Sequence, residues 1–475
     1  MLKETYKTLA SPLSLIFKRS IAESEVPPDW KTAHVHAVHK KGDTTQPSNY
    51  RPISLTSVIG KILESLVRDE IVSHMMTQGL FCDAQHGFVP GRSCATQLLV
   101  VLEHWTKSLD DGEPVDAIYL DFRKAFDSVP HERLLAKLSN YGIRGPLLKW
   151  IREFLTGRKH RVVLNGTFSS WTEVLSGIPQ GSVLGPTLFV CFINDLPETV
   201  TSTIQIFADD TKIYRAIGNQ EDHTTLQADL QALKRWSDRW QLHFNEDKCK
   251  VLHLGNKNRK LSYLMGTTTL ETTALEKDLG VHIDEHLKFH QHVSLCVKKA
   301  NKILGLIKHT FCNLDEVSLP LLYKSLVRPH LEYANVIWHP RFVTDENELE
   351  KVQRRATKLI PHLAHLPYEQ RLEHLGLPTL RHRRLRGDLI QIFKIFKGFD
   401  RLDPAIFFQL HQYPSTRGHN LKLAKPRCNS NLRSNTFSNR VINNWNSLPE
   451  AIVQATTINM FKSLIDKHLS NERYT

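Results

Sequence analysis

Short β-prone runs alternate with helical patterns over roughly the first 285 residues. Apolar residues three or four positions apart predict helices over 1–20, 57–75, from 93, 130–138, 146–155, 186–194 and 222–240. Strand-like runs cover 33–38, 161–164 and 172–175, precede Asp121, and stand on both sides of Asp209. This interleaving of helices and strands predicts an α+β or α/β fold.

Beyond about residue 285 the pattern becomes mostly helical. Residues 293–307 and 349–360 predict amphipathic helices with one basic face, and 380–386 add four arginines. Such a charged face is either solvated or a surface that follows phosphates, and the pattern leaves both open. Residues 411–435 are polar and loop-like. We therefore expect an N-terminal helical segment (1–26), a unit of mixed helices and strands (27–285) and a helical C-terminal region (286–475).

Two adjacent aspartates, Asp209 and Asp210, lie between two short strand patterns, which predicts a hairpin with both carboxylates at its turn. A third carboxylate, Asp121, ends an apolar run. Like charges side by side cost free energy unless a cation neutralises them, and Mg²⁺ prefers oxygen ligands. Three such carboxylates can hold two metal ions about 4 Å apart for phosphoryl transfer. Alone, an Asp-Asp pair is more often a solvated turn; its surroundings favour a site.

The net charge of the chain indicates which class of molecule it binds. Lys and Arg outnumber Asp and Glu by 62 to 49, giving a net charge of +13. This excess favours a polyanion such as nucleic acid, although a merely basic soluble enzyme is the alternative. We find no signal-peptide pattern and no membrane-spanning apolar run. The 7 cysteines are scattered without a C-x-x-C pair, which argues against zinc fingers and disulfides and indicates an intracellular compartment.

A cluster of three histidines, His34, His36 and His39, raises the question of a metal site. They alternate with apolar residues over the strand pattern at 33–38, so we expect a polar strand face instead.

The order of the motifs is the most specific signal. An Arg-Pro-Ile-Ser segment comes first, then an Asp-terminated strand, a Pro-Gln-Gly loop and the Asp-Asp hairpin. This series resembles the reverse transcriptase domain of non-LTR (LINE-type) retrotransposons. The resembling blocks are 49–55, 85–93, 119–129, 176–186, 207–210, 245–249 and 279–284, with weaker matches at 325–334 and 437–445.

The resemblance implies an α+β right-hand polymerase with fingers, palm and thumb, and a mostly helical C-terminal region. Asp121, Asp209 and Asp210 would hold two Mg²⁺ ions, with Mn²⁺ possible, and the backbone carbonyl of Phe122 would be a further ligand. Phe126 would exclude a ribose 2′-hydroxyl, so that the product is DNA. Residues 279–283 would grip the primer, and the helices after about 290 would form the thumb.

Further roles follow from the same resemblance. Gln180 and Gly181 would lie over the incoming nucleotide and the templating base. Arg51 is a candidate triphosphate contact, since guanidinium binds phosphate in a bidentate manner. Lys40 and Lys41 are weaker candidates. Lys248 would donate a proton to the leaving pyrophosphate, or else is a simple surface lysine.

The implied activity is RNA-directed DNA synthesis from an RNA template, a DNA primer and dNTPs, in the nucleus, the cytoplasm or both. Elements of this type encode an endonuclease upstream, and this chain starts just before the fingers, so we expect a truncated or partial copy that cannot nick its own target. A zinc knuckle found in some relatives is also missing. Two alternatives remain: an RNA-binding or maturation factor whose catalysis is dispensable, and an inactive remnant on the same fold.

Overall fold

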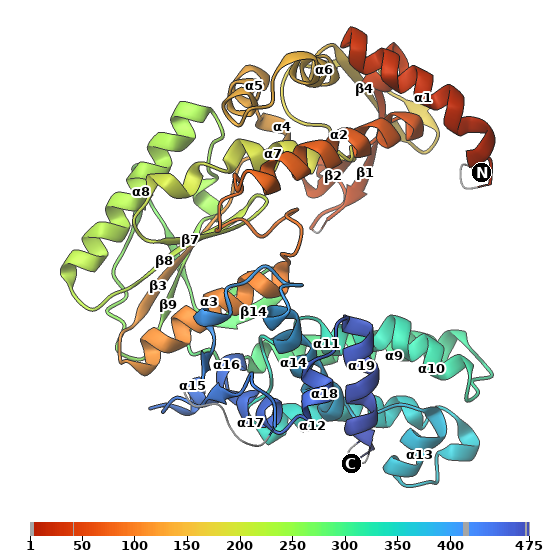
Figure 1. Cartoon of the computed structure of the whole chain (residues 1–475), viewed down its shortest axis with the longest axis vertical. Coiled ribbons are helices and arrows are strands. Elements are labelled where there is room, and N and C mark those ends of the chain that lie inside the picture. Colours follow the sequence, from red (N-terminus) through yellow and green to blue (C-terminus); the bar gives the residue numbers. More distant parts are fainter. Residues whose placement is uncertain (1–3, 41, 412–417, 471–472, 475) are drawn as a thin grey trace.

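The computed structural model of the chain describes residues 4–40, 42–411, 418–470 and 473–474. It forms an arch in which one sheet and its helices lie at the top, a second sheet lies at the left, and the C-terminal helices lie below (Figure 1). The predicted α+β class and helical C-terminal region are confirmed. No helix in the described part of the chain combines the length and apolarity needed to cross a membrane.

The second sheet, which we call the palm sheet, contains the predicted acidic hairpin. Its strand order is β12-β9-β3-β8-β7. The strands are β12 (Glu271–Thr273), β9 (Lys250–Leu254), β3 (Val115–Leu120), β8 (Asp210–Ala216) and β7 (Thr203–Phe207). All neighbours are antiparallel except β12 and β9.

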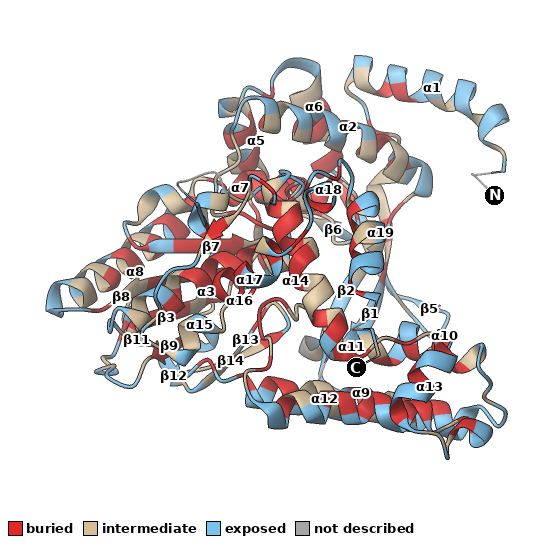
Figure 2. Ribbon diagram, turned by 60° about the horizontal axis from the view of Figure 1, so that its bottom comes forward, coloured by how far each residue is buried: buried red, intermediate tan, exposed pale blue. Residues whose placement is uncertain are grey.

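The upper sheet, which we call the fingers sheet, follows the order β2-β1-β4-β5, with β6 also paired to β4. Its strands are β1 (Thr32–His39), β2 (Tyr50–Leu55), β4 (Arg158–Leu164), β5 (Thr167–Phe168) and β6 (Thr172–Val174). Figure 2 shows that this sheet exposes much more of its surface than the palm sheet does. The histidines of β1 lie on this sheet as a strand, as expected.

Helices cover both sheets. Those of the first half are α1 (Tyr6–Glu23), α2 (Val58–Thr77), α3 (Cys94–Asp110), α4 (Ala125–Ser128), α5 (His131–Asn140), α6 (Gly145–Leu155), α7 (Gly185–Ile193) and α8 (Gln220–Trp240). Capping explains where two of them begin. The Ser57 hydroxyl accepts from Gly60 N at the start of α2, and Ser93 forms a reciprocal capping box with Thr96 at the start of α3.

The rest of the chain consists mostly of helices, which range from 4 to 21 residues in length. They are α9 (His290–Thr310), α10 (Ser318–Leu322), α11 (Arg328–Glu332), α12 (Val343–Thr357), α13 (Tyr368–Leu375), α14 (Leu380–Phe396), α15 (Asn431–Ser434), α16 (Phe437–Arg440), α17 (Ile442–Asn446), α18 (Glu450–Val453) and α19 (Ile458–His468). The polar segment at 411–435 is mostly loop, and its residues 412–417 lie outside the described residues.

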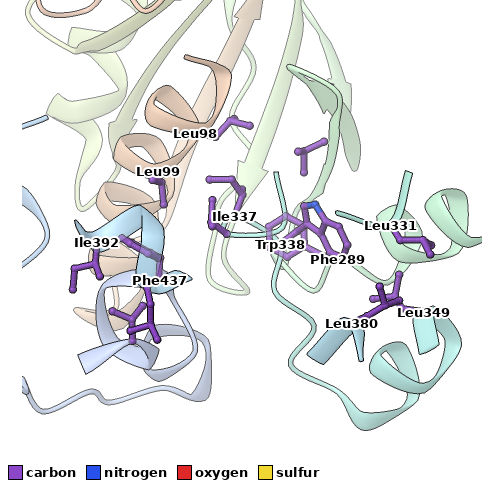
Figure 3. Packing of buried hydrophobic residues seen from close by; sticks show 14 of the residues in the cluster. Leu98, Leu99, Phe289, Leu331, Ile337, Trp338, Leu349, Leu380, Ile392 and Phe437 are labelled. Atoms are coloured by element: carbon purple, nitrogen blue, oxygen red, sulfur yellow. The ribbon is translucent and has the colours of Figure 1, made fainter. Parts of the chain in front are cut away.

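Two hydrophobic cores meet at the palm sheet, because alternate residues of each strand point to opposite faces. On β3, Ile118 and Leu120 face a core shared with α2, α5, α6, α7 and α8. Val115 and Ala117 face a second core, which joins α3 to the C-terminal helices. Figure 3 shows this second core around Leu98, Ile337 and Phe437. It continues across residue 285.

Polar contacts also fasten the C-terminal region to α3. Asp110, the last residue of α3, accepts hydrogen bonds from Asn429 N at 3.0 Å and from the Ser430 hydroxyl at 2.6 Å. Glu103, two turns further in, pairs with Arg433 and accepts a bond of 2.6 Å from the Ser438 hydroxyl. A buried apolar face and paired charges therefore hold the end of the chain on the palm.

The basic run at 380–386 differs from both expectations. Arg383 pairs with Glu332, Arg384 is buried against Glu346, and Arg386 pairs with Asp466. These three side chains form ion pairs within the C-terminal region. They therefore form neither a freely solvated face nor a surface that follows phosphates. By contrast, the cationic face of α12 is exposed, as its helical spacing predicts.

Candidate active site

The three predicted carboxylates meet at one end of the palm sheet. In the β3–β8 ladder the final pair is Leu120 with Thr211, so one further step of the register sets Asp121 beside Asp210. Phe207 pairs with Asp210 across the β7–β8 hairpin, which leaves Ala208 and Asp209 as its turn. Ala208 takes φ 55, the left-handed conformation that such tight turns require. The predicted hairpin is thus present, with the acids at its tip.

These carboxylates interact through their charge. Desolvation and the nearby charge of Asp121 raise the pKa of Asp209, while the charges of Arg51 and Lys40 lower it. Asp210 is exposed at the start of β8, yet partial desolvation of its carboxylate and the charges of Asp209 and Asp278 raise its pKa to about 6. Asp209 and Asp210 are therefore each less stable as an anion than an aspartate in water.

A divalent cation would relieve that repulsion, and an all-oxygen donor set suits Mg²⁺ or Mn²⁺ better than a softer metal. Within the described residues, no three His, Cys, Asp or Glu side chains are already gathered as tightly as the ligands of a bound ion. Asp121, Asp209 and Asp210 fit a divalent cation in chemistry and in charge; their final spacing would be set by the ion.

The segment after Asp121 is held by the 243–245 segment. Asn245 N donates to the Asp121 carbonyl at 2.7 Å, and Arg123 N donates to the His243 carbonyl at 2.8 Å. Successive backbone groups of an extended chain point to opposite sides, so the Phe122 carbonyl points away from this segment, toward the side on which β8 begins. The Phe122 ring stacks on Phe244 at 4.4 Å between centroids.

Lys248 comes from the 3₁₀ turn Glu246–Lys248, just before β9. Its Nζ lies 3.6 Å from Asp121 Oδ2, and its side chain is 68% exposed. The structure thus brings an exposed ammonium group to the edge of the carboxylate cluster.

Phe126 lies on the short helix α4, with its ring stacked on Phe189 of α7 at 4.5 Å. It is half-buried, so one part of the ring is anchored in the core and the rest faces outward. The backbone around it is fixed by Ile178 N, which donates to the Phe126 carbonyl at 2.7 Å.

The Pro-Gln-Gly loop runs along β2. Ser54 N donates to the Gln180 carbonyl at 2.8 Å, and a Cβ on Gly181 would lie 2.4 Å from the Ser54 carbonyl oxygen. Gly181 also has φ +114, so only glycine allows this close approach. The Gln180 side chain donates to Asp127 Oδ1 at 2.8 Å and therefore points to α4, not to the carboxylate cluster.

Arg51, also on β2, is exposed, and it lies near enough for its charge to act on Asp209. Lys40 acts on the same carboxylate. Lys41 lies outside the described residues.

The motif at 85–93 carries no predicted role, and its structure reveals one. Gln85 is fully buried, and its Oε1 accepts hydrogen bonds from Gly87 N at 2.7 Å and from Ala208 N at 3.0 Å. A Cβ on Gly87 would lie 2.4 Å from Ala208 N. Arg92 closes the loop by donating to the carbonyls of Cys82 and Gln85. This loop therefore clamps the turn that carries Asp209.

A second missed feature lies beneath the carboxylates. Lys212, two residues after Asp210, forms a buried ion pair with Asp278; the two side chains are only 2% and 4% exposed. Asp278 ends β13 (Leu275–Asp278), which pairs with β14 (Val281–Asp284). This pair ties the acidic hairpin to the 279–283 segment. The Tyr333 hydroxyl then holds that segment by donating to the Leu279 carbonyl at 2.8 Å.

Comparison with known families gives one match over most of this region. Residues 38–307 match the family described as reverse transcriptase (RNA-dependent DNA polymerase). The matched stretch contains the whole palm sheet, the fingers sheet except most of β1, and the three carboxylates of the site.

Curated relatives extend the match. The chain is 29% identical over 362 residues to the probable RNA-directed DNA polymerase from transposon X-element of Drosophila melanogaster, covering 73% of this chain and 39% of that protein. It is 26% identical to the RNA-directed DNA polymerase from mobile element jockey of the same species, covering 76% and 40%. The chain thus spans about two fifths of their length. Among solved structures, telomerase from Candida albicans aligns with a TM-score of 0.41 at 9% identity, covering 74% of this chain and 67% of that one.

Proposed function

The chain belongs to the reverse transcriptase family, and we propose that it is an RNA-directed DNA polymerase that extends a DNA primer with dNTPs along an RNA template. The family and the α+β right-hand fold predicted from the motifs are confirmed. One observation carries the proposal. Three carboxylates from two neighbouring strands converge at the end of the palm sheet, with one pKa raised to about 6.

Asp121, Asp209, Asp210 and the Phe122 carbonyl are the proposed metal ligands. Two Mg²⁺ ions held there, or Mn²⁺, would lower the pKa of the primer 3′-hydroxyl and neutralise the triphosphate and the leaving pyrophosphate. The protein's own contribution is placement: the Gln85 clamp fixes the turn that carries Asp209, and the β3–β8 register fixes Asp121 beside Asp210.

The remaining residues are proposed to handle the nucleotide. Arg51 would bind the triphosphate, since its charge already reaches Asp209. Gln180 and Gly181 would support the nucleotide and templating base through the backbone that runs beside β2.

The other two residues would act on the sugar and on the leaving group. The anchored Phe126 ring would block a ribose 2′-hydroxyl. Lys248, exposed at the edge of the cluster, would give a proton to pyrophosphate.

The assignment extends to the whole chain. We propose that residues 27–285 form fingers and palm, that residues 286–475 form the helical thumb and C-terminal region, and that 1–26 is an accessory helical segment. We further propose an origin in a non-LTR retrotransposon and action inside the cell, in the nucleus, the cytoplasm or both. The net charge of +13 supports an RNA–DNA partner.

Primer extension tests the proposal. The full chain, its Asp209→Ala variant and a control variant, Asp111→Ala at the exposed end of α3, are incubated with poly(rA)/oligo(dT), dTTP and Mg²⁺. We expect the native chain and the control to extend the primer and Asp209→Ala to lose at least about 100-fold in rate, the scale of one transition-state contact.

Other outcomes point elsewhere. If neither the native chain nor the variant extends the primer but both bind the RNA–DNA duplex, the chain is a nucleic-acid-binding protein on a polymerase fold. If Asp209→Ala retains full activity, the carboxylates are not the metal site.

A further inference from the structure

The exposed end of the fingers sheet carries an aromatic cluster that none of the roles above uses. The Arg161 guanidinium lies 4.1 Å from the Phe168 ring centroid and 4.6 Å from that of Trp171. It also donates to His34 Nε2 at 3.1–3.2 Å. We call Arg161, His34, Phe168 and Trp171 the fingers cluster. A guanidinium that contacts both rings favours one position for each of them.

Both rings remain open to solvent despite this contact. Phe168 is 49% exposed and Trp171 is 44% exposed, so each keeps about half of its surface available. Large aromatic side chains usually bury most of their area, and an ordered, exposed group of them marks a binding surface.

The surrounding charge identifies the partner. Strands β1, β2, β4 and β5 contain no Asp or Glu, whereas they carry Arg51, Arg158, Lys159, Arg161 and four histidines. The acid next to this group, Glu173 of β6, lies 3.9 Å from Lys159. Aromatic faces within a cationic surface are the features by which proteins hold single-stranded nucleic acid.

The sheet register connects this cluster to the proposed active site. His34 pairs with Leu55 on one side and with Arg161 on the other, and Val38 pairs with Arg51. Because Leu55 and Arg51 are four residues apart on one strand, both point to the same face, and His34 and Arg161 share it. The face that presents Arg51 toward Asp209 thus continues to the fingers cluster.

The distance between Arg51 and Arg161 along that face can be converted into a number of nucleotides. Four residues at about 3.3 Å and two strand spacings of about 4.8 Å separate Arg51 from Arg161, or about 16 Å in total. At about 3.4 Å per stacked nucleotide this corresponds to roughly five nucleotides.

We propose that the fingers cluster stacks unpaired bases of the RNA template about five nucleotides ahead of the templating position. This inference rests on the proposed function and adds the path of the single-stranded template. Stacking on Trp171 and Phe168 tolerates any base, since every base has a π-face. The cluster would hold the single-stranded template in place before it is copied, whatever the template sequence.

Binding to substrates with different overhangs tests this. A labelled DNA primer is annealed to RNA templates with 5′ overhangs of one or ten nucleotides, and the dissociation constant of the full chain is measured by fluorescence anisotropy without dNTPs. The variants are Trp171→Ala, Trp171→Phe, and the control Leu175→Ala, which removes an 86% exposed residue next to the same hairpin. The native chain should bind the substrate with the ten-nucleotide overhang about tenfold more tightly than the substrate with the one-nucleotide overhang.

Trp171→Ala should abolish that preference, Trp171→Phe should keep most of it, and Leu175→Ala should leave it unchanged. The proposal is overturned if Trp171→Ala keeps the preference, if Leu175→Ala loses it equally, or if the native chain has none. A change in self-association of Trp171→Ala with an intact overhang preference would assign the surface to a second copy of the chain instead.

A separate readout isolates the proposed function. A one-nucleotide template overhang is too short to reach the fingers cluster. On that substrate, Trp171→Ala should therefore add a single dNTP at the same rate as the native chain. If the native chain adds no nucleotide, polymerase activity is refuted, while the overhang preference still decides whether the cluster binds single-stranded RNA.

Discussion

The buried pair of Lys212 and Asp278 allows a quantitative test of how the acidic hairpin is supported. Both side chains are almost fully buried, at 2% and 4% exposed, and each is the neutralising charge of the other. Removing one partner leaves a desolvated charge without its counterion, which typically costs about 3–5 kcal/mol. We therefore expect Lys212→Met and Asp278→Leu each to lower the free energy of unfolding in urea by that amount.

The double variant should behave differently. With both charges replaced by apolar side chains of similar volume, no ion remains buried, and such replacements are often neutral or stabilising. Lys212→Met/Asp278→Leu should therefore recover most of the stability that either single variant loses. The matched control is Lys250→Met on β9, two strands away from Lys212 in the same sheet. Its partner Glu271 is 69% exposed, so its loss should cost at most about 1 kcal/mol.

Activity gives a second readout, because these charges act on Asp210. The Lys212 cation lowers the pKa of Asp210 and the Asp278 anion raises it. Lys212→Met should move the acid limb of the pH–activity profile to higher pH, and Asp278→Asn should move it to lower pH. The reasoning is wrong if both single variants cost less than about 1 kcal/mol, or if the two limbs move in the same direction.

Three further predictions address the proposed site. Phe126→Ala should raise the rate of UTP incorporation relative to dTTP on poly(rA) at least about tenfold, because it removes the proposed steric block. Unchanged selectivity would show that the Phe126 ring does not exclude the 2′-hydroxyl. Because the pKa of Asp210 is raised to about 6 and only the ionised carboxylate binds a cation, extension at limiting Mg²⁺ should fall about tenfold per pH unit below 6, and a flat profile between pH 5 and 8 would contradict this. Gly181→Ala places a Cβ 2.4 Å from the Ser54 carbonyl oxygen and should reduce extension at least about tenfold, whereas Gly305→Ala, a helical position with open space around it, should be silent in the same assay.

Local signals in the sequence predicted local structure well. Ser57 and Ser93 precede apolar periodicity and begin α2 and α3, because a hydroxyl at that position satisfies a free backbone N–H. The Asp-Asp hairpin was also predictable, since two strand patterns flank a two-residue turn. The positions of Asp121 and Asp209 relative to one another followed from motif order and are consistent with the ladder register.

Long-range polar pairs were not predictable. Lys212 and Asp278 are 66 positions apart, and nothing in the pattern around either residue indicates that both are buried. Arg383, Arg384 and Arg386 form a basic run whose partners lie between 38 and 80 positions away. Hydrophobic periodicity predicts which face of a helix or strand is apolar. It does not predict which distant carboxylate will pair with a buried cation.

The attachment of the C-terminal region to α3 also bears on how the protein is made. The contact between Glu103 and Ser438 joins residues 335 positions apart. At a synthesis rate of about 5–20 residues per second, roughly 20 to 70 s pass between the emergence of these two partners from the ribosome. During that interval the apolar face of α3 has no C-terminal helices to cover it. The core on this side of the palm sheet can therefore be completed only after the C-terminal helices are synthesised, and until then the apolar face of α3 is a surface open to non-native contacts.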